Sequence, residues 1–187
     1  MATPPDFSVG QVLTAAHMDA VGLWLIDEVS VTAAADLIVD GCFSNQFQNY
    51  RIVWSGETSS NAGVFFRFRG GTPAADRMAT QYISMGLDRN GATLATFGSD
   101  VKADNLYFSN SGGSTCLASA TYDIFRPFES VRTGIIWSTF FEWTSNAFFY
   151  RAGGGYYDTT DSNTGFKIYT SGGPTQTSTV RVYGYRN

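Results

Sequence analysis

The sequence predicts an all-β protein, a jelly-roll-like antiparallel β-sandwich that follows a short N-terminal helical segment. Three observations indicate this fold. Apolar runs of strand length recur along nearly the whole chain. Clusters of Gly, Ser and Thr, which are typical of tight turns, separate these runs. The runs follow no fixed repeat, which disfavours a propeller or a β-helix and favours a sandwich or jelly roll. We therefore expect a docking segment over 1–22 and a single β-sandwich domain over 23–187.

The start of the chain carries a helical pattern. Thr14 is a good N-cap, and Leu13 and Met18 occupy the two positions of a hydrophobic staple around it. Leu13, Met18 and Val21 form a short apolar edge, and Gly22 follows where helices commonly end. A helix of about two turns is marginal alone, because nucleation costs more than so few hydrogen bonds return. It must dock on its own sheet or on a partner. The candidate docking residues are Phe7, Leu13, Met18 and Val21.

After this helix, strands are expected to alternate with turns. In the run over 64–69 two Phe alternate with two Arg, which is the two-residue period of a strand. A turn over 88–91 contains Asn-Gly, a strong hairpin signal. A turn at 55–56 with a polar loop over 57–63, and the triple glycine at 153–155, are interpreted as breaks between strands. The expected strands cover 23–31, 37–43, 50–54, 64–69, 81–87, 106–108, 115–124, 134–143, 147–151, 166–170 and 180–185.

Composition disfavours several classes of protein. The net charge of −4 and the scattered arginines give no basic patch for nucleic acid. No apolar stretch approaches the length that spans a bilayer, so we expect no membrane insertion. The first residues lack the basic start and apolar run of a signal peptide. Cys42 and Cys116 lie in apolar, strand-like segments, where buried free thiols are favoured over a disulfide for a protein made in a reducing cytosol.

The residue inventory also disfavours an enzyme. His17 is the only histidine, and it lies in the N-terminal helix, away from the loops of the β-domain. A Ser-His-Asp or Cys-His arrangement needs that histidine beside a nucleophile. One His and two separated Cys do not make an ordinary zinc site. The chain has no Gly-x-x-x-x-Gly-Lys phosphate loop. We expect no catalytic residues and no cofactor.

The acidic segment over 158–165 is a candidate metal or catalytic site. Asp158, Asp161 and Asn163 could offer oxygens to Ca²⁺, but their spacing is not that of an EF-hand and the distal Glu is missing. Paired acids of a glycosidase are a weaker alternative. Because Asp and Asn are ordinary turn residues, the segment is interpreted as a turn without a metal.

Aromatic residues suggest two further surfaces. Tyr156, Tyr157 and Asp158 follow a Gly-rich stretch and would suit a glycan, although a structural use of the rings in a core or interface is favoured. The segments 140–143 and 148–150 carry aromatic residues at both odd and even positions. Since these positions point to opposite faces of a strand, the pattern implies burial on both faces of the sheet. Since a sandwich has one inner face, we expect another subunit to cover part of the outer one.

Four segments of the chain carry a resemblance to one family. The first is Phe-Ser-Val-Gly-Gln-Val-Leu-Thr-Ala-Ala-His-Met-Asp-Ala over 7–20, and the others cover 35–44 followed by 48–53, 65–72 and 179–185. Together they resemble small virion structural proteins of tailed bacteriophages, often described as minor tail or tail-fibre-like proteins. That family usually carries Tyr-Asp-Asn-Tyr where this sequence has Phe-Gln-Asn-Tyr over 47–50.

The resemblance implies a non-enzymatic virion protein, assembled in the cytoplasm of a bacterial host. It further implies a homo-oligomer, with a trimer as the usual solution, that docks through its N-terminus on other virion proteins of the tail or capsid. The loops far from the N-terminus would then face solvent or a host-surface glycan. A tail or fibre-associated component is the first expectation. A capsid-decoration (cement or head-knob) protein and a carbohydrate-binding module are the alternatives.

Overall fold

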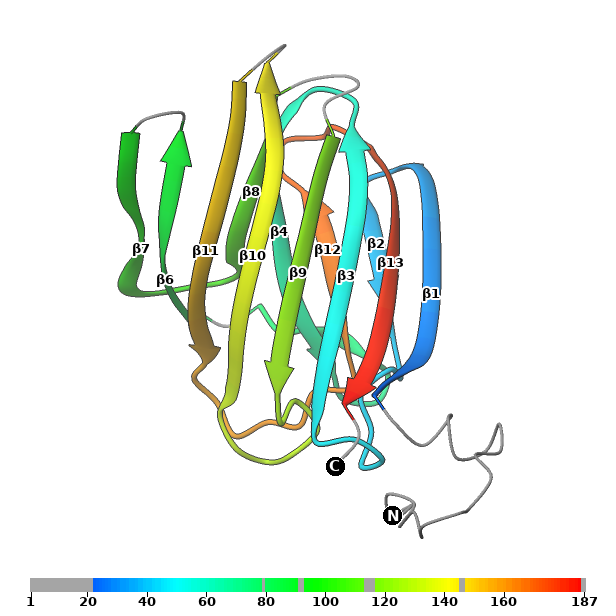
Figure 1. Cartoon of the computed structure of the whole chain (residues 1–187). Helices are drawn as coiled ribbons and strands as arrows, with labels where there is room; N and C mark the ends of the chain where they lie inside the picture. Colours follow the sequence, from blue (N-terminus) through cyan, green and yellow to red (C-terminus); the bar gives the residue numbers. More distant parts are fainter. Residues whose placement is uncertain (1–21, 79, 91–92, 113–116, 145–146, 186–187) are drawn as a thin grey trace, which may run out of the picture.

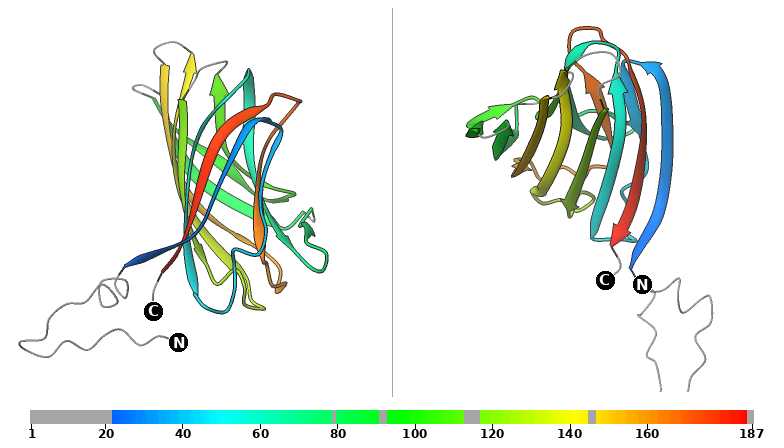
Figure 2. Two further views of the ribbon diagram at one scale, coloured as in Figure 1. Left: turned by 90° about the vertical axis from the view of Figure 1, so that its right-hand side faces the viewer. Right: turned by 45° about the horizontal axis from the view of Figure 1, so that its top comes forward.

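The computed structural model of the protein describes residues 22–78, 80–90, 93–112, 117–144 and 147–185. Within these ranges the chain forms thirteen strands in two antiparallel sheets that face each other (Figures 1 and 2). The all-β expectation is confirmed. The described ranges contain no helix, and so none that is long and apolar enough to cross a membrane. The expected docking helix and its residues Phe7, Leu13, Met18 and Val21 lie outside the described residues.

The larger sheet, which faces the viewer in Figure 1, has eight strands in the order β1-β13-β3-β9-β10-β11-β6-β7. Its central strands are joined in sequence as β9, β10 and β11, whereas β1 and β7 form the two edges. We call it the large sheet. Its strands are β1 (Leu23–Ala34), β3 (Asn49–Thr58), β6 (Tyr82–Asn90), β7 (Thr93–Ala103), β9 (Leu117–Phe125), β10 (Thr133–Thr144), β11 (Ala147–Tyr157) and β13 (Gln176–Tyr185).

The second sheet, here the small sheet, lies behind it and has five strands. Three of them run in the order β2-β12-β4, and both β5 and β8 pair with β4. Because the large sheet is wider, its β6–β7 hairpin extends beyond the edge of the small sheet (Figure 1). The strands are β2 (Asp36–Val39), β4 (Asn61–Gly70), β5 (Ala75–Asp76), β8 (Leu106–Gly112) and β12 (Gly165–Thr170).

The core between the sheets is rich in aromatic rings. Phe66 on β4 stacks on Phe166 of β12, with ring centroids 5.3 Å apart, and also meets Tyr122 of the large sheet at 5.3 Å. All three are at most 1 % exposed. The alternation expected for 64–69 is confirmed, because Phe66 and Phe68 point inward. Their Arg neighbours lie on the opposite face, where they form ion pairs.

Two expected breaks in the chain are wrong. β3 continues through Gly56 to Thr58, and only Ser59 and Ser60 connect it to β4 in the opposite sheet. β11 likewise runs through the triple glycine at 153–155 without interruption. In both strands the glycines allow close approach: a Cβ at Gly56 would lie 2.3 Å from Cβ of Ser178, and one at Gly155 would lie 2.2 Å from the carbonyl oxygen of Ile83.

The hairpin expected near 88–91 is confirmed, because β6 and β7 pair in register up to Asn90 and Thr93. β7 itself was not expected, since the sequence over 93–103 mixes small, polar and charged residues without a clear apolar period.

The strand directions define two ends of the sandwich. Leu23 pairs with Tyr185, so β1 begins where β13 ends. β11 ends at Tyr157 at this same end, which is the lower one in Figure 1. We call it the N-terminal end and the other the distal end.

Candidate functional site

The outer face of the large sheet carries a group of exposed apolar side chains over β10, β11, β6 and β7. The strand register places Phe140 opposite Tyr150, and the ring of Phe140 stacks on Phe148 at 5.5 Å. Exposed fractions range from 38 % for Phe140 to 66 % for Leu94. We call this surface the apolar face. It consists of Met85, Leu87, Leu94, Ile136, Phe140, Phe148 and Tyr150.

The aromatic run of β10 and β11 supplies both sides of the sheet, as the two parities predict. Phe141 is fully buried and stacks on Phe149 at 5.0 Å, within or against the core. Taking roughly 200 Å² for each large side chain, about half of it exposed, the seven side chains together present roughly 700 Å² to solvent. Arg89 interrupts them, because the register places it between Tyr150 and Leu94. The summed area exceeds the ~300–600 Å² of the largest apolar patch on a typical monomer. It is close to the ~800 Å² that one partner contributes to a standard protein interface.

The structure separates the residues proposed for a glycan. Tyr157 is 1 % exposed and packs in the core, with its ring 4.8 Å from Tyr82. Its burial raises the pKa of its hydroxyl. The expectation that Tyr157 reaches the surface is therefore wrong, because neighbouring residues of a strand point to opposite faces. Tyr156 points outward and is half-buried. Nε of Arg132 forms an ion pair with a carboxylate oxygen of Asp158 at 2.6 Å, and only 12 % of the Asp158 side chain is exposed.

Beside Tyr156 the outer face of the large sheet is hollowed. Gly134 on β10 lies between Phe125 of β9 and Tyr156 of β11 in the strand register. The guanidinium of Arg132 lies 5.7 Å from the ring centroid of Tyr156. We call this depression of about 360 Å³ the Gly134 hollow. Its lining residues are Phe125, Arg126, Arg132, Gly134 and Tyr156.

Sequence reasoning identified only Tyr156 of this hollow. The other four residues come from two strand ends and from the loop over 126–132, and only the register brings them together. The hollow also lies at the N-terminal end of the sheet, the end from which a docking segment would leave.

The acidic segment over 158–165 does not gather its oxygens around one point. Asp158 pairs with Arg132, whereas Asp161 lies 3.7 Å from a nitrogen of Arg77. Asn163 is buried, and its amide donates to the hydroxyl of Thr133 at 3.3 Å. Across the part of the chain that the structure describes, no group of three or more His, Cys, Asp or Glu side chains could hold a metal ion.

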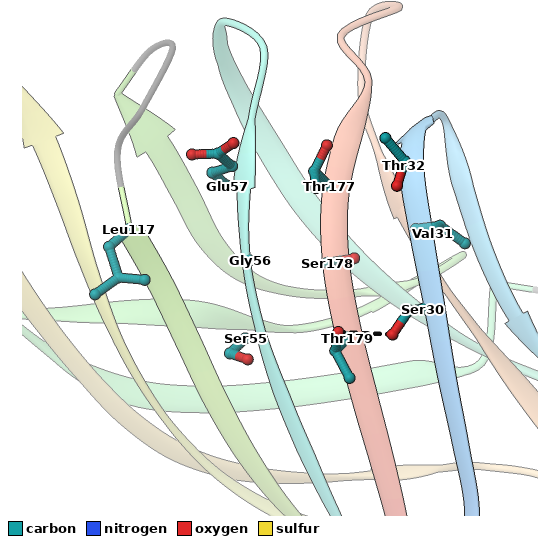
Figure 3. A pocket seen from close by; sticks show the side chains of 10 residues that line it. All are labelled: Ser30, Val31, Thr32, Ser55, Gly56, Glu57, Leu117, Thr177, Ser178 and Thr179. Carbon is teal, nitrogen blue, oxygen red and sulfur yellow. Dashed lines mark hydrogen bonds between the residues drawn. The ribbon is translucent and has the colours of Figure 1, made fainter.

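A second hollow, of about 400 Å³, lies toward the distal end of the same face, over β1, β13, β3 and β9 (Figure 3). Hydroxyl groups dominate it, and the one pair joined by a dashed line in Figure 3 is Ser30 and Thr179 at 2.8 Å. Its lining includes Glu57 and Leu117 but no aromatic ring. It therefore lacks the flat apolar surface on which a sugar ring would stack.

The outer face of the small sheet is covered by ion pairs. Arg69 on β4 donates to both oxygens of Asp40, at 2.7 and 3.1 Å, and also to Asp76. Asp76 in turn pairs with Lys167 on β12. Burial opposes ionisation of Asp76, but hydrogen bonds from Lys167 and Arg69 outweigh it and lower the pKa of that carboxyl below its usual value.

Arg67 completes this cover. Its guanidinium pairs with Asp104 at 2.5 Å and lies 4.8 Å from the ring centroid of Tyr169. Because each of these cations faces a carboxylate of the same chain, we interpret the group as structural: it links neighbouring strands and replaces an apolar cover on this side.

Cys42 is confirmed as a buried free thiol, and burial raises its pKa well above the ordinary value. Cys116 and His17 lie outside the described residues.

Comparison with known proteins gave no match to a family model, to a curated protein or to a solved structure. The apolar face and the Gly134 hollow are therefore the features from which we infer a function.

Proposed function

We propose that the protein is a non-enzymatic structural component of a tailed-bacteriophage virion, a tail or fibre-associated protein that assembles as a homo-oligomer. The observation that supports assembly is the apolar face. A monomer would leave roughly 700 Å² of Met, Leu, Ile, Phe and Tyr side chains in water, which soluble monomers rarely do. Covering this face with a second copy would add one standard interface per subunit.

A trimer is the form that the resemblance to phage fibre proteins supports. The apolar face lies toward one side of the large sheet, over the strands next to the β7 edge, and not at its centre. A patch placed off-centre can meet a different surface of the next copy, and such head-to-tail contacts close into a ring when the rotation fits. We further propose that the sandwich is of the jelly-roll type, because the chain crosses repeatedly between the two sheets.

Docking on the particle is assigned to the segment over 1–22, with Phe7, Leu13, Met18 and Val21 as contact residues. The protein would be made in the host cytoplasm and act in the virion. Capsid decoration is the second candidate, since the same apolar face would serve copies arranged on a shell. A carbohydrate-binding module is the third, and the Gly134 hollow is the feature that supports it.

Light scattering coupled to size-exclusion chromatography tests the assembly proposal. The wild-type protein is expected to elute at about three times its chain mass of 20.3 kDa. The double variant Leu87→Glu, Phe148→Glu places two charges on the apolar face, and it should elute as a folded monomer. Ser55→Glu, at an exposed position on the same face of the sheet but outside the apolar face, should leave the trimer intact. A wild-type monomer at micromolar concentration would contradict the proposal.

A further inference from the structure

We propose that the Gly134 hollow is a binding site for an acidic saccharide, a sugar ring that carries a carboxylate. The proposal names a ligand class for the carbohydrate-binding candidate of the proposed function and rests on that function for its biological role. The hollow lies at the N-terminal end, and not among the distal loops that were expected to face a host-surface glycan. The binding itself is a property of the folded domain.

The shape of the Gly134 hollow favours a ring-shaped ligand. Gly134 stands between two aromatic residues on neighbouring strands, and its missing side chain leaves the hollow open. The fold does not need glycine here: an added Cβ would meet its nearest atom, in the ring of Phe125, at an ordinary 3.5 Å. The open space is therefore not explained by packing. Phe125 and Tyr156 offer apolar ring surface on either side, against which the C–H face of a sugar can pack.

The charge of the residues that line the hollow favours an anionic ligand. The five lining residues include two arginines and no carboxylate. Asp158 accepts from Nε of Arg132 and orients the guanidinium, while 68 % of the Arg132 side chain remains exposed. Arg126 has a φ of 56°, in the left-handed region, and its Nη1 lies 4.0 Å from a carboxylate oxygen of Glu129. Glu129 itself accepts from Gln48 at 3.2 Å, outside the hollow. Arg132 contributes an exposed guanidinium to the hollow and Arg126 adds a second cation to its lining, and such cations are suited to hold a carboxylate.

A binding site for nucleic acid also combines aromatic rings with arginine, but it differs from this hollow in its charge. Binding of a nucleic-acid strand requires a track of cations along its phosphates. This chain carries a net charge of −4. Along the same face of β10 the hollow is followed by Ile136, a member of the apolar face. Arg51, on the same face of β3, is paired with Asp123 at 2.8 Å. One charged ring fits this site better than a polyanion.

Saturation-transfer difference NMR with trigalacturonate and with its methyl ester tests the proposal. The two ligands share a sugar backbone and differ in charge. We expect signal transfer to the ring protons of trigalacturonate, and at least tenfold weaker binding of the ester. Gly134→Val fills the hollow and Arg132→Gln removes one cation, and each should weaken binding at least tenfold.

Two matched variants serve as controls. Gly154→Val adds the same side chain on the neighbouring strand, where its Cβ would meet its nearest atom at an ordinary 3.5 Å. Arg181→Gln removes an exposed arginine that pairs with Glu28 elsewhere on the sheet. Both should bind like wild type, and circular dichroism should report the same fold for all four variants.

Failure of trigalacturonate to bind, equal binding of the ester, or tighter binding of adenosine monophosphate would each overturn the proposal. So would equal loss in the Gly134→Val and Gly154→Val variants. None of these outcomes changes the mass of the assembled protein or its presence on particles, so failure of this inference is distinguishable from failure of the proposed function.

Discussion

Trp137 and Gly153 face each other across β10 and β11, and the indole ring occupies the space that a side chain at position 153 would need. A Cβ at Gly153 would lie 2.7 Å from Cζ2 of Trp137 and 2.6 Å from the carbonyl oxygen of Met85. Trp137 is 2 % exposed, so its ring has no free space into which to move. The glycine at 153 is therefore a packing requirement of the core.

Gly153→Ala is accordingly expected to destabilise the domain by about 2 kcal/mol, the usual cost of overpacking a well-filled core. The measurement is urea unfolding followed by tryptophan fluorescence. Gly154→Ala is the matched control, because a Cβ there meets the carbonyl oxygen of Ile135 at 3.5 Å and a side-chain carbon of Ile136 at 4.0 Å. It should leave the free energy of unfolding within about 0.5 kcal/mol of wild type. Equal losses in the two variants would contradict this account.

The ion pairs of the small sheet predict a loss of stability in acid. The pKa of Asp76 is lowered in the folded protein by Lys167 and Arg69, against the opposing effect of burial. A carboxyl of this kind stabilises the fold fully above its unfolded pKa of about 4, and that stabilisation is lost as pH falls through the lower folded value. Asp123, whose pKa is lowered by hydrogen bonds from Arg51 and Tyr185 that outweigh its burial, adds to the same trend.

Asp76→Asn should lower the free energy of unfolding by about 2 kcal/mol at pH 7, because it weakens two charge-assisted contacts. The difference from wild type should begin to shrink as pH falls below about 4, where the carboxyl of the unfolded chain takes up a proton, and should disappear once pH has passed the lower folded pKa. Asp161→Asn is the control: this carboxylate is 55 % exposed and 3.7 Å from Arg77, so its loss should cost less than about 0.5 kcal/mol. Denaturant titrations between pH 2 and pH 7 would measure both variants. A constant gap between Asp76→Asn and wild type across that range would refute the explanation.

Local pattern in the sequence was sufficient for much of the fold. The alternation of Phe66 and Phe68 with two arginines identified both the strand and its inward face, and Asn90-Gly91 located a hairpin. The glycines at 56 and 153–155 were wrongly interpreted as breaks between strands. The sequence does not distinguish a glycine needed for close approach of strands from one needed for a turn.

The Gly134 hollow could not be predicted from the local pattern of the sequence. Phe125, Gly134 and Tyr156 become neighbours only through the register of three strands, and that register was not part of the pattern. Tyr157 was misplaced for a related reason. A pair of adjacent tyrosines must divide between the two faces of a strand, but which one is buried depends on what packs against it.

Deletion of residues 1–22 is expected to leave a folded β-domain that no longer joins particles. The strands of the sandwich begin at Leu23, which pairs with Tyr185, so the deletion ends where the described sheet starts. Circular dichroism and thermal unfolding would test the fold, and complementation of a gene deletion followed by analysis of purified particles would test docking. A truncated protein that unfolds would assign the segment to the core of its own domain and remove the docking role.

The last prediction concerns the location of the protein on the virion. A fibre or tail component is present in few copies, so deletion of its gene should reduce adsorption to cells and leave the heat resistance of the heads unchanged. A decoration protein binds only the assembled shell in many copies and stabilises it by mass action, so its loss should make heads heat-labile. We expect the first result: few copies per wild-type particle, imaging signal on the tail, and an adsorption defect that the wild-type gene corrects.

Complementation with the variant Leu87→Glu, Phe148→Glu should fail to restore adsorption, whereas Ser55→Glu should succeed, because only the former alters the apolar face. Hundreds of copies with heat-labile heads would favour decoration. Unchanged adsorption and heat resistance would count against both the tail or fibre role and the decoration role. Loss of an activity on a defined polysaccharide on substitution of Asp158 or Asp161 would overturn the non-enzymatic proposal itself.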